Sequence, residues 1–366
     1  MDFGAGILYS VFMRVTLKAI AEKAGVSVST VSLALRNDPR IKDKTRKEIK
    51  SIADALGYTP NPLLSSLASR QFRQSETFEG LGIAYLTWLP NLNRNAKDDY
   101  PYVTAYMNGA GPRAKELGYR LEHVELSAQK SLAALGRILY QRGFAGVILG
   151  PVRNTKEEFD FPWHLFSVVA CGGVEPHLAR RFHWVKTDFF GVTGRAYRRA
   201  WDAGYRRIVV VLAEQTGEIE ETDLRLGAVL TAGQRLHPSK KTLVFTYKQT
   251  LTEEEREDMK QAFLSFVRKH KADMVIGYSL EFYYALIQNG YNVPRDVPYI
   301  SLHIRPDDKW YDPLSGYLIN QMKIGRAAVD QVDAQIHYGV RGPVQEPRTI
   351  TLMPDWLERE TFPVSR

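Results

Sequence analysis

The sequence predicts a small all-α module followed by a larger α/β body that is built from two lobes. Three observations predict this fold class. Apolar residues recur at helical spacing between residues 16 and 56. From residue 82 onward, short apolar runs alternate with helical segments, which is typical of parallel sheets with helices on both faces. The chain has 366 residues, and its second part is too long for one sheet, so we expect two similar lobes.

The first module contains two short helices joined by a tight turn. Thr16 can cap the first helix, and Gly25 can end it. The second helix runs from about Ser29 to Leu35, and a third follows over residues 43–56. This pattern predicts a helix-turn-helix. The outward residues of the second helix suit entry into the major groove because they are small and mostly polar: Ser29, Thr30, Ser32, Leu33 and Arg36.

The positive charge of the chain is concentrated in and just after this module. The chain has a net charge of +8, and residues 13–73 hold twelve Lys or Arg against five Asp or Glu, a difference of +7. A basic module on a near-neutral body indicates a polyanionic partner such as DNA. The alternative is a solvated basic helical surface with no such partner.

The run VTLKAIAEKAGVSVSTVSLALRNDPRIKDKTRKEIKSIADALGYTPNPLLSSLASR resembles the DNA-binding head of the lactose-repressor/galactose-repressor (LacI/GalR) family. The resemblance covers the whole head without a gap, from T-L-x-x-I-A-x-x-A-G-V-S through T-V-S and T-R to L-G-Y-x-P-N. It implies a DNA-binding head over residues 13–60 and a hinge helix with its linker over residues 61–74. It also implies a homodimer that binds a pseudo-palindromic double-stranded DNA operator.

The same resemblance implies a role for individual residues of the head. Val28, Ser29 and Leu33 match base-reading positions, while Thr30, Ser32 and Arg36 match phosphate-binding positions. The remaining DNA contacts that it implies are Thr16, Thr45, Asn61, Leu64, Leu67 and Ala68. Leu33 departs from the polar or basic residue usual in the family. A leucine can contact a thymine methyl but cannot form a bidentate pair with guanine. The alternative is that Leu33 is a core residue.

Residues 61–69 (NPLLSSLAS) form a short amphipathic segment. Pro62 suits a first helical turn, but a helix of this length does not persist alone in water. In the resembled family this hinge helix folds on operator DNA and inserts a leucine into the minor groove, which bends the duplex. The matching residue is Leu67. The alternative is that Leu67 docks on the body.

The body is expected to alternate strands and helices. The expected strands are 82–86, 120–124, 146–149, 167–170, 208–212, 274–277 and 299–302. The expected helices are 102–117, 132–141, 190–203, 253–270 and 281–288. From 79 to 358 this body resembles the type I periplasmic-binding-protein sensor of the same family, with markers that include LYQRGFAGVILG, Arg225-x-Gly227 and GYNVPRDVPYISL. The run NQMKIGRAAVDQV fits the last crossover between the lobes.

That resemblance implies an effector site between the lobes, beyond the carboxyl ends of the strands. The matching strand ends and adjacent loops hold Tyr85, Trp88, Cys171, Asp188, Arg225, Tyr278, His303 and Gln321. Arg225 is the strongest candidate because its fork can hold neighbouring hydroxyls or a carboxylate. Tyr278-Ser279 and His303-Ile304 replace the family's frequent Asn-Asp and Asp-Asp, so a plain hexose is less expected. The family favours a sugar or sugar derivative as the effector.

The composition fits a cytoplasmic protein with no membrane partner. No apolar run approaches the roughly 18 residues of a membrane span. The single cysteine, Cys171, fits a reducing cytosol and excludes an internal disulfide framework. Residues 1–12 (MDFGAGILYSVF) are a poor signal peptide. Because Met13 directly precedes the patterned segment, we expect them to be an upstream extension or a mis-chosen start.

The sequence carries no catalytic motif that points to an enzyme. It lacks G-x-S-x-G, G-x(4)-G-K-[ST], H-E-x-x-H and paired cysteines, so no cofactor or metal is expected. His164, His177 and His183 have no usual metal-ligand spacing. The rival functions are a solute-binding protein, which the body alone would permit, and an enzyme on a two-lobed scaffold. The expected function is a regulator, by default a repressor released by an inducer; activation by a corepressor is the alternative.

Overall fold

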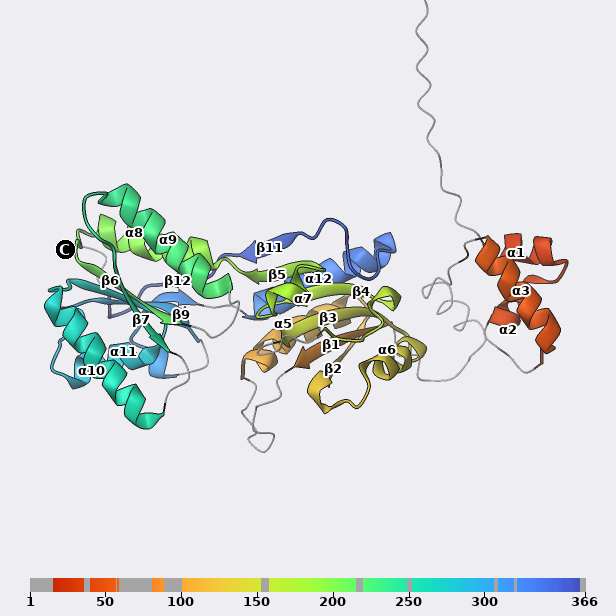
Figure 1. Cartoon of the computed structure of the whole chain (residues 1–366), viewed down its shortest axis with the longest axis horizontal. Coiled ribbons are helices and arrows are strands. Elements are labelled where there is room, and N and C mark those ends of the chain that lie inside the picture. Colours follow the sequence, from red (N-terminus) through yellow and green to blue (C-terminus); the bar gives the residue numbers. More distant parts are fainter. Residues whose placement is uncertain are drawn as a thin grey trace, which may run out of the picture. The chain divides into compact units, whose positions relative to one another are not determined.

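The computed structural model describes residues 16–35, 40–56, 58, 81–88, 101–152, 158–214, 220–248, 252–305, 309–318 and 321–362. The chain divides into two compact units, Met1–Phe78 and Glu79–Arg366. The first unit contains the head, and the second contains two six-stranded sheets with their helices. Figure 1 shows the elements of each unit in the colours of the sequence.

The head consists of three helices around a small apolar core. These helices are α1 (Leu17–Ala24), α2 (Val28–Leu35) and α3 (Asp43–Ala55). Thr16 caps α1, since its hydroxyl accepts a hydrogen bond from the Ala19 amide at 3.3 Å. Such a cap contributes about 1 kcal/mol. Gly25 ends α1 in the left-handed conformation with φ 64°, which glycine adopts without the Cβ clash of other residues. Both expected helix boundaries are confirmed.

The core of the head is a cluster of six buried residues, one pair from each helix: Ile20, Ala21, Val31, Ala34, Ile49 and Ala53. We call it the head core. The helical spacing of these pairs makes one apolar stripe on each helix, and three stripes together close the core. The core therefore fixes which face of α2 points outward.

The first lobe of the body is a parallel sheet covered by helices on both faces. The strand order is β11-β5-β4-β3-β1-β2, and every pairing is parallel. Its strands are β1 (Gly82–Trp88), β2 (Arg120–Glu125), β3 (Phe144–Val152), β4 (Ser167–Cys171), β5 (His183–Thr187) and β11 (Thr349–Leu352). Its helices are α5 (Pro101–Glu116), η1 (Leu126–Ala128), α6 (Leu132–Gln141), η2 (Trp163–Leu165), α7 (Pro176–Ala179) and α12 (Gln321–Tyr338).

The second lobe repeats this architecture with one antiparallel edge. The strand order is β12-β10-β9-β8-β6-β7, and only β10 and β12 are antiparallel. Its strands are β6 (Ile208–Glu214), β7 (Leu243–Lys248), β8 (Met274–Gly277), β9 (Tyr299–Ile304), β10 (Ser315–Leu318) and β12 (Asp355–Leu357). Its helices are α8 (Phe189–Asp202), α9 (Glu220–Leu236), α10 (Glu253–Lys269), α11 (Leu280–Gln288) and η3 (Lys309–Tyr311).

Alternate residues of the β6, β8 and β9 strands face opposite layers of helices. Val209, Val211 and Val275 belong to the cluster that includes α10 and α11. Val210 and Ile276 belong to the cluster that includes α8 and α9. This two-residue period is what a sheet buried on both faces requires. The expected α/β class with two lobes is therefore confirmed.

The chain crosses between the two lobes three times: after β5, after β10 and after β11. The run that begins at Asn320 was expected to be the last crossover, and this expectation is wrong. Most of it forms α12, which packs on the first lobe, and the last crossing follows later, between Leu352 and Asp355. The body also continues past residue 358, because Phe362 is buried in the second lobe and the Thr361 hydroxyl donates to the Tyr299 carbonyl at 2.8 Å.

Every strand and helix that was expected in the body is present within three residues of its expected ends. The elements that were not expected are β5, α7, β7, α9, β10, α12, β11 and β12, besides the short 3-10 turns. Among the described helices, none is both long and apolar enough to cross a membrane.

Helices α5 and α12 of the first lobe pack with their backbones in close approach. A Cβ atom at Gly109 would lie 1.9 Å from the Met322 carbonyl oxygen, and one at Gly325 would lie 2.1 Å from that of Tyr106. Each helix therefore has a glycine where the other helix's backbone passes. A larger residue at either position would force the two helices apart.

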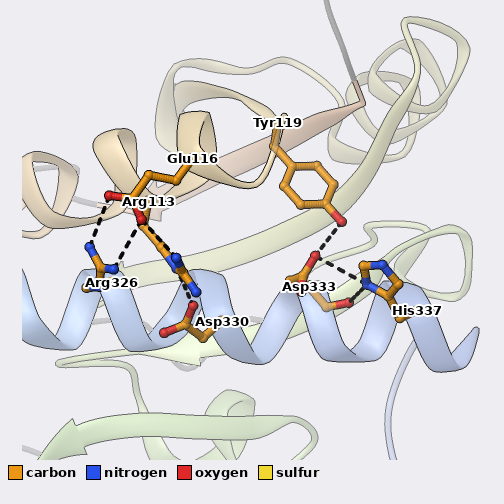
Figure 2. Close-up of polar contacts among 7 residues, drawn as sticks. All are labelled: Arg113, Glu116, Tyr119, Arg326, Asp330, Asp333 and His337. Carbon is orange, nitrogen blue, oxygen red and sulfur yellow. Dashed lines mark hydrogen bonds and ion pairs between the residues drawn. The ribbon is translucent and has the colours of Figure 1, made fainter.

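Polar contacts continue this packing along the same two helices (Figure 2). Arg326 donates to Glu116 at 3.1 Å, and Arg113 pairs with Asp330. Further along, the Tyr119 hydroxyl donates to Asp333 at 2.7 Å. The charged pairs are largely exposed and screened by solvent, so they contribute little to the stability of the lobe. Their contribution is to hold the register of α12 against α5.

Candidate functional site

Helix α2 begins with a local hydrogen-bond cluster of hydroxyls. The Ser27 hydroxyl accepts from the Thr30 amide at 3.1 Å, which caps the first turn. The same hydroxyl lies 2.7 Å from the Ser29 hydroxyl and 2.8 Å from the Thr30 hydroxyl. Behind this turn, Val31 and Ala34 anchor α2 in the head core. The hydrogen bonds of Ser27 and the packing of Val31 and Ala34 thus both stabilise the start of the helix.

The residues expected to read bases lie on the outer side of α2. Val28 is 44% exposed, and Ser29 is also exposed. Leu33 is half-buried and does not belong to the head core or to the residues packed against it. This placement argues against the alternative that Leu33 is a core residue. The exposed Val28 and the half-buried Leu33, both outside the head core, suit contact with thymine methyl groups.

Two of the residues expected to contact phosphate and two of the other expected DNA contacts lie among the described residues of the head. Thr30 and Ser32 are half-buried on α2, Thr16 is the exposed cap of α1, and Thr45 is half-buried in the first turn of α3. Five further DNA contacts expected from the sequence lie outside the described residues: Arg36, Asn61, Leu64, Leu67 and Ala68. Their roles stay predictions.

The exposed surface of the head carries an excess of cations. The exposed cationic residues include Lys18, Lys23, Arg40, Lys42, Lys44 and Lys47. Arg46 differs, since it pairs with Asp43 at 3.0 Å and donates to the Ile41 carbonyl at 2.9 Å. A cationic head can neutralise phosphates and attract DNA over a distance of about 10 Å at ordinary salt.

In the first lobe, two of the expected effector residues are core residues. Tyr85 lies in the middle of β1 and Cys171 at the end of β4, both with no exposed surface. The Tyr85 hydroxyl donates to the Cys171 sulfur at 3.8 Å. Burial raises the pKa of the Cys171 thiol to about 12. In this arrangement neither side chain offers a surface to a ligand, and the thiol is not a nucleophile at neutral pH.

The other expected residues of the first lobe lie at element ends. Trp88 is the last residue of β1, is half-buried, and packs on Phe159 with ring centroids 4.9 Å apart. Gln321 begins α12 and is 9% exposed. Trp88 thus lies at the carboxyl end of its strand, as expected for a site residue, and its ring packs against Phe159.

In the second lobe, the structure brings four expected effector residues together around Phe189. The Arg225 guanidinium carbon lies 4.8 Å from the Phe189 ring centroid and 5.1 Å from that of Tyr278. The Tyr278 ring centroid lies 5.0 Å from that of His303. Asp188 precedes Phe189 and caps α8, where it accepts from the Gly191 amide at 2.8 Å. Tyr278 follows β8 and His303 lies near the end of β9, so this cluster occupies the carboxyl edge of the sheet.

Arg225 was expected at a strand end or in a loop, and this expectation is wrong. It lies inside α9 and is 2% exposed. The structure adds two residues that sequence reasoning missed, Glu221 and Thr193, which accept hydrogen bonds from its guanidinium at 3.1 and 3.3 Å. The i, i+4 spacing of Glu221 and Arg225 was the available signal, but it has meaning only once the helix is known.

A second missed group lies at the carboxyl ends of β1 and β2. The Thr87 hydroxyl donates to Glu125 at 2.7 Å and lies 2.8 Å from Nε2 of His123. Burial lowers the pKa of His123, and the nearby Glu125 partly opposes this shift. Only the pairing of the two strands brings these residues together, so no local pattern could reveal them.

Within the described parts of the chain, no group of three or more His, Cys, Asp or Glu residues is arranged to hold a metal ion. His164 and His177 are exposed, and His183 lies in β5.

Two family models match the chain. Residues 16–61 match the lacI family of bacterial regulatory proteins, and residues 197–362 match the periplasmic binding protein-like domain. The first match covers all three helices of the head, and the second covers most of the second lobe. The chain thus carries a head of the lacI family followed by a periplasmic-binding-protein-like body.

Relatives and solved structures agree with this assignment. The probable HTH-type transcriptional repressor ExuR of Bacillus subtilis is 51% identical over 57 residues, 16% of this chain and 17% of that protein. The HTH-type transcriptional regulator TreR of Salmonella typhimurium is 26% identical over 196 residues, 53% of this chain and 56% of that protein. The chain thus matches between 17% and 56% of the length of these two curated relatives.

Solved structures of the same fold cover nearly the whole chain. The complex of the transcriptional regulator CelR with cellobiose has a TM-score of 0.55 at 20% identity and covers 95% of this chain and 100% of that chain. The lac repressor dimer bound to operator and the anti-inducer ONPF has a TM-score of 0.53 at 16% identity. It covers 95% of this chain and 98% of that chain. At these identities the likeness establishes the fold alone.

Proposed function

We propose that the chain is a sequence-specific DNA-binding transcriptional repressor whose operator affinity is controlled by a small molecule bound between the two lobes of its body. The observation that carries this proposal is the capped helix α2, which presents Val28 and Ser29 outward on a head that matches the lacI family. We further propose that it acts as a homodimer on a pseudo-palindromic operator in the cytoplasm. It is not an enzyme in this proposal.

The cluster around Arg225 supports a polar effector, and the comparisons favour a carbohydrate. Aromatic rings with a few convergent polar groups are the usual composition of sugar-binding and other small-molecule sites. The relative structures were solved with cellobiose and with ONPF, which are ligands of those proteins. For this chain we propose a sugar or sugar derivative that contacts Arg225, Tyr278 and His303 in the second lobe and Trp88 in the first. Effector binding would then change the arrangement of the lobes and alter the hinge segment. This change would couple the effector to DNA.

The experiment that tests this function is a selection of random duplex DNA by the purified chain, with and without a panel of carbohydrates. We expect one palindrome of roughly 14–20 base pairs with a deformable central step. A carbohydrate that releases the selected DNA would identify the effector class and show an inducer. Retention that requires the carbohydrate would show a corepressor. Binding that depends on salt but not on DNA sequence would refute the proposal and favour a solute-binding protein.

A further inference from the structure

The guanidinium of Arg225 is enclosed by four side chains of its own lobe. Its Nε and Nη2 donate to Oε1 of Glu221 at 3.3 and 3.1 Å, and its Nη1 donates to the Thr193 hydroxyl at 3.3 Å. Its guanidinium carbon also lies over the rings of Phe189 and Tyr278, 4.8 and 5.1 Å from their centroids. The side chains of Arg225 and Glu221 are 3% and 11% exposed. The ion pair is therefore shielded from solvent. Charges interact more strongly in such a buried environment than in water.

Glu221 leaves this part of the site without a net positive charge. The Arg225–Glu221 pair is neutral as a unit. An incoming carboxylate or phosphate would have to compete with Glu221 for the cation. It would also meet the negative charge of Glu221 in a region of low dielectric constant, which is unfavourable.

Arg225 can still donate hydrogen bonds to a neutral ligand. A guanidinium has five N–H groups, and the described residues accept from three of them, on Nε, Nη1 and Nη2. One N–H on each terminal nitrogen remains for other acceptors. Two neighbouring hydroxyls of a sugar match this pair of donors and bring no charge into the site.

We propose that Glu221 determines the charge of the effector: it restricts the site to uncharged polyhydroxylated ligands, and loss of its carboxylate opens the site to sugar acids. This inference rests on the proposed function, in which Arg225 contacts the effector. Glu221 acts on specificity through Arg225, by supplying the negative charge that an acidic ligand would otherwise supply.

The test compares matched sugars with the full-length chain in the absence of DNA. The melting temperature is measured against D-glucose and D-glucuronate, and against D-galactose and D-galacturonate, at constant ionic strength. In the wild type, the uncharged sugar of each pair stabilises the chain at least as much as the acid. Glu221→Gln shifts the ratio of apparent affinities toward the acid by about tenfold or more, equal to about 1.4 kcal/mol.

Three controls separate this effect from general ones. Glu257→Gln removes a carboxylate from an exposed ion pair with Lys260 on α10 and leaves the preference unchanged. The double variant Glu221→Gln/Arg225→Gln removes both buried charges and shows no gain for the acid. Glu221→Gln alone leaves a buried cation unpaired and is less stable, so D-glucuronate should restore its melting temperature where D-glucose does not.

Two results overturn the proposal: a wild type that is stabilised more by the acids, or a Glu221→Gln variant that gains no more from the acids than Glu257→Gln does. Operator binding is not part of this measurement. Loss of operator recognition would therefore refute the proposed function and leave the charge preference standing, while an unchanged charge preference would refute only the role of Glu221.

Discussion

Replacement of Leu33 by alanine should weaken operator binding without loosening the head. Leu33 is half-buried on α2 but lies outside the head core, so its truncation leaves that core intact. Such a change alters stability by within about 0.5 kcal/mol. A lost contact with a thymine methyl costs about 1–3 kcal/mol at each half-site. This corresponds to about 5- to 150-fold in operator affinity for each half-site.

Ile20→Ala provides the matched contrast on the same module. Ile20 has no exposed surface and belongs to the head core. Truncation of a buried isoleucine to alanine costs about 2–5 kcal/mol, and a domain as small as the head has little stability in reserve. Ile20→Ala should therefore unfold much of the head, and both specific and nonspecific DNA binding should fall together.

The assay combines two measurements on the intact chain. Fluorescence anisotropy gives the affinities for the selected operator and for a scrambled duplex at one salt concentration. Amide hydrogen exchange reports the local opening of α1, α2 and α3. Leu33→Ala should lose operator affinity alone and keep the protection of all three helices. Equal loss of protection in Leu33→Ala and Ile20→Ala would show that Leu33 is a core residue and refute the reasoning.

Three further predictions concern other parts of the chain. Leu67→Ala should weaken operator binding and leave nonspecific binding nearly intact in the same anisotropy assay; equal losses would indicate a folding defect instead. Lys44→Gln/Lys47→Gln should make the slope of log affinity against log salt shallower by up to about 1.8, because each phosphate contact contributes about 0.9; an unchanged slope would place both exposed lysines away from the DNA. Cys171 should resist alkylation by iodoacetamide at pH 8 until the chain is unfolded, because its buried thiol has a pKa of about 12, far above that pH, and stays protonated; modification at the rate of the unfolded chain would contradict its burial.

The sequence predicted the elements whose signals are local. Helix α1 begins and ends at residues with a specific chemical role, Thr16 as cap and Gly25 as left-handed terminator. Helix α10 is similar, since Thr252 and Glu255 form a capping box before an apolar stripe. In both helices the ends are determined by neighbouring residues, which a single sequence displays directly.

The elements and site residues that were missed depend on distant parts of the chain. Helix α9 contains Gly227 and Gly233, which weaken its local helical signal. Gly233 is required there because a Cβ atom would lie 2.0 Å from the Thr242 hydroxyl, a constraint that only the folded lobe imposes. Because α9 was not expected, the sequence offered no geometric reason to pair Arg225 with Glu221. The burial of Tyr85 against Cys171 depends likewise on the packing of β1 and β4 in one sheet, 86 residues apart.

The glycines at the crossing of α5 and α12 have a mechanical consequence for the first lobe. Helix α12 starts three residues after β10 of the second lobe, and α5 is the first helix after β1. At Gly109 and Gly325 the two helices approach each other with no side chain between their backbones, so little at this crossing point can deform. We therefore expect the two helices to move together. A displacement of α12, which follows β10 of the second lobe in the chain, would then also displace α5. Helix α5 belongs to the part of the body that comes first after the hinge in the chain.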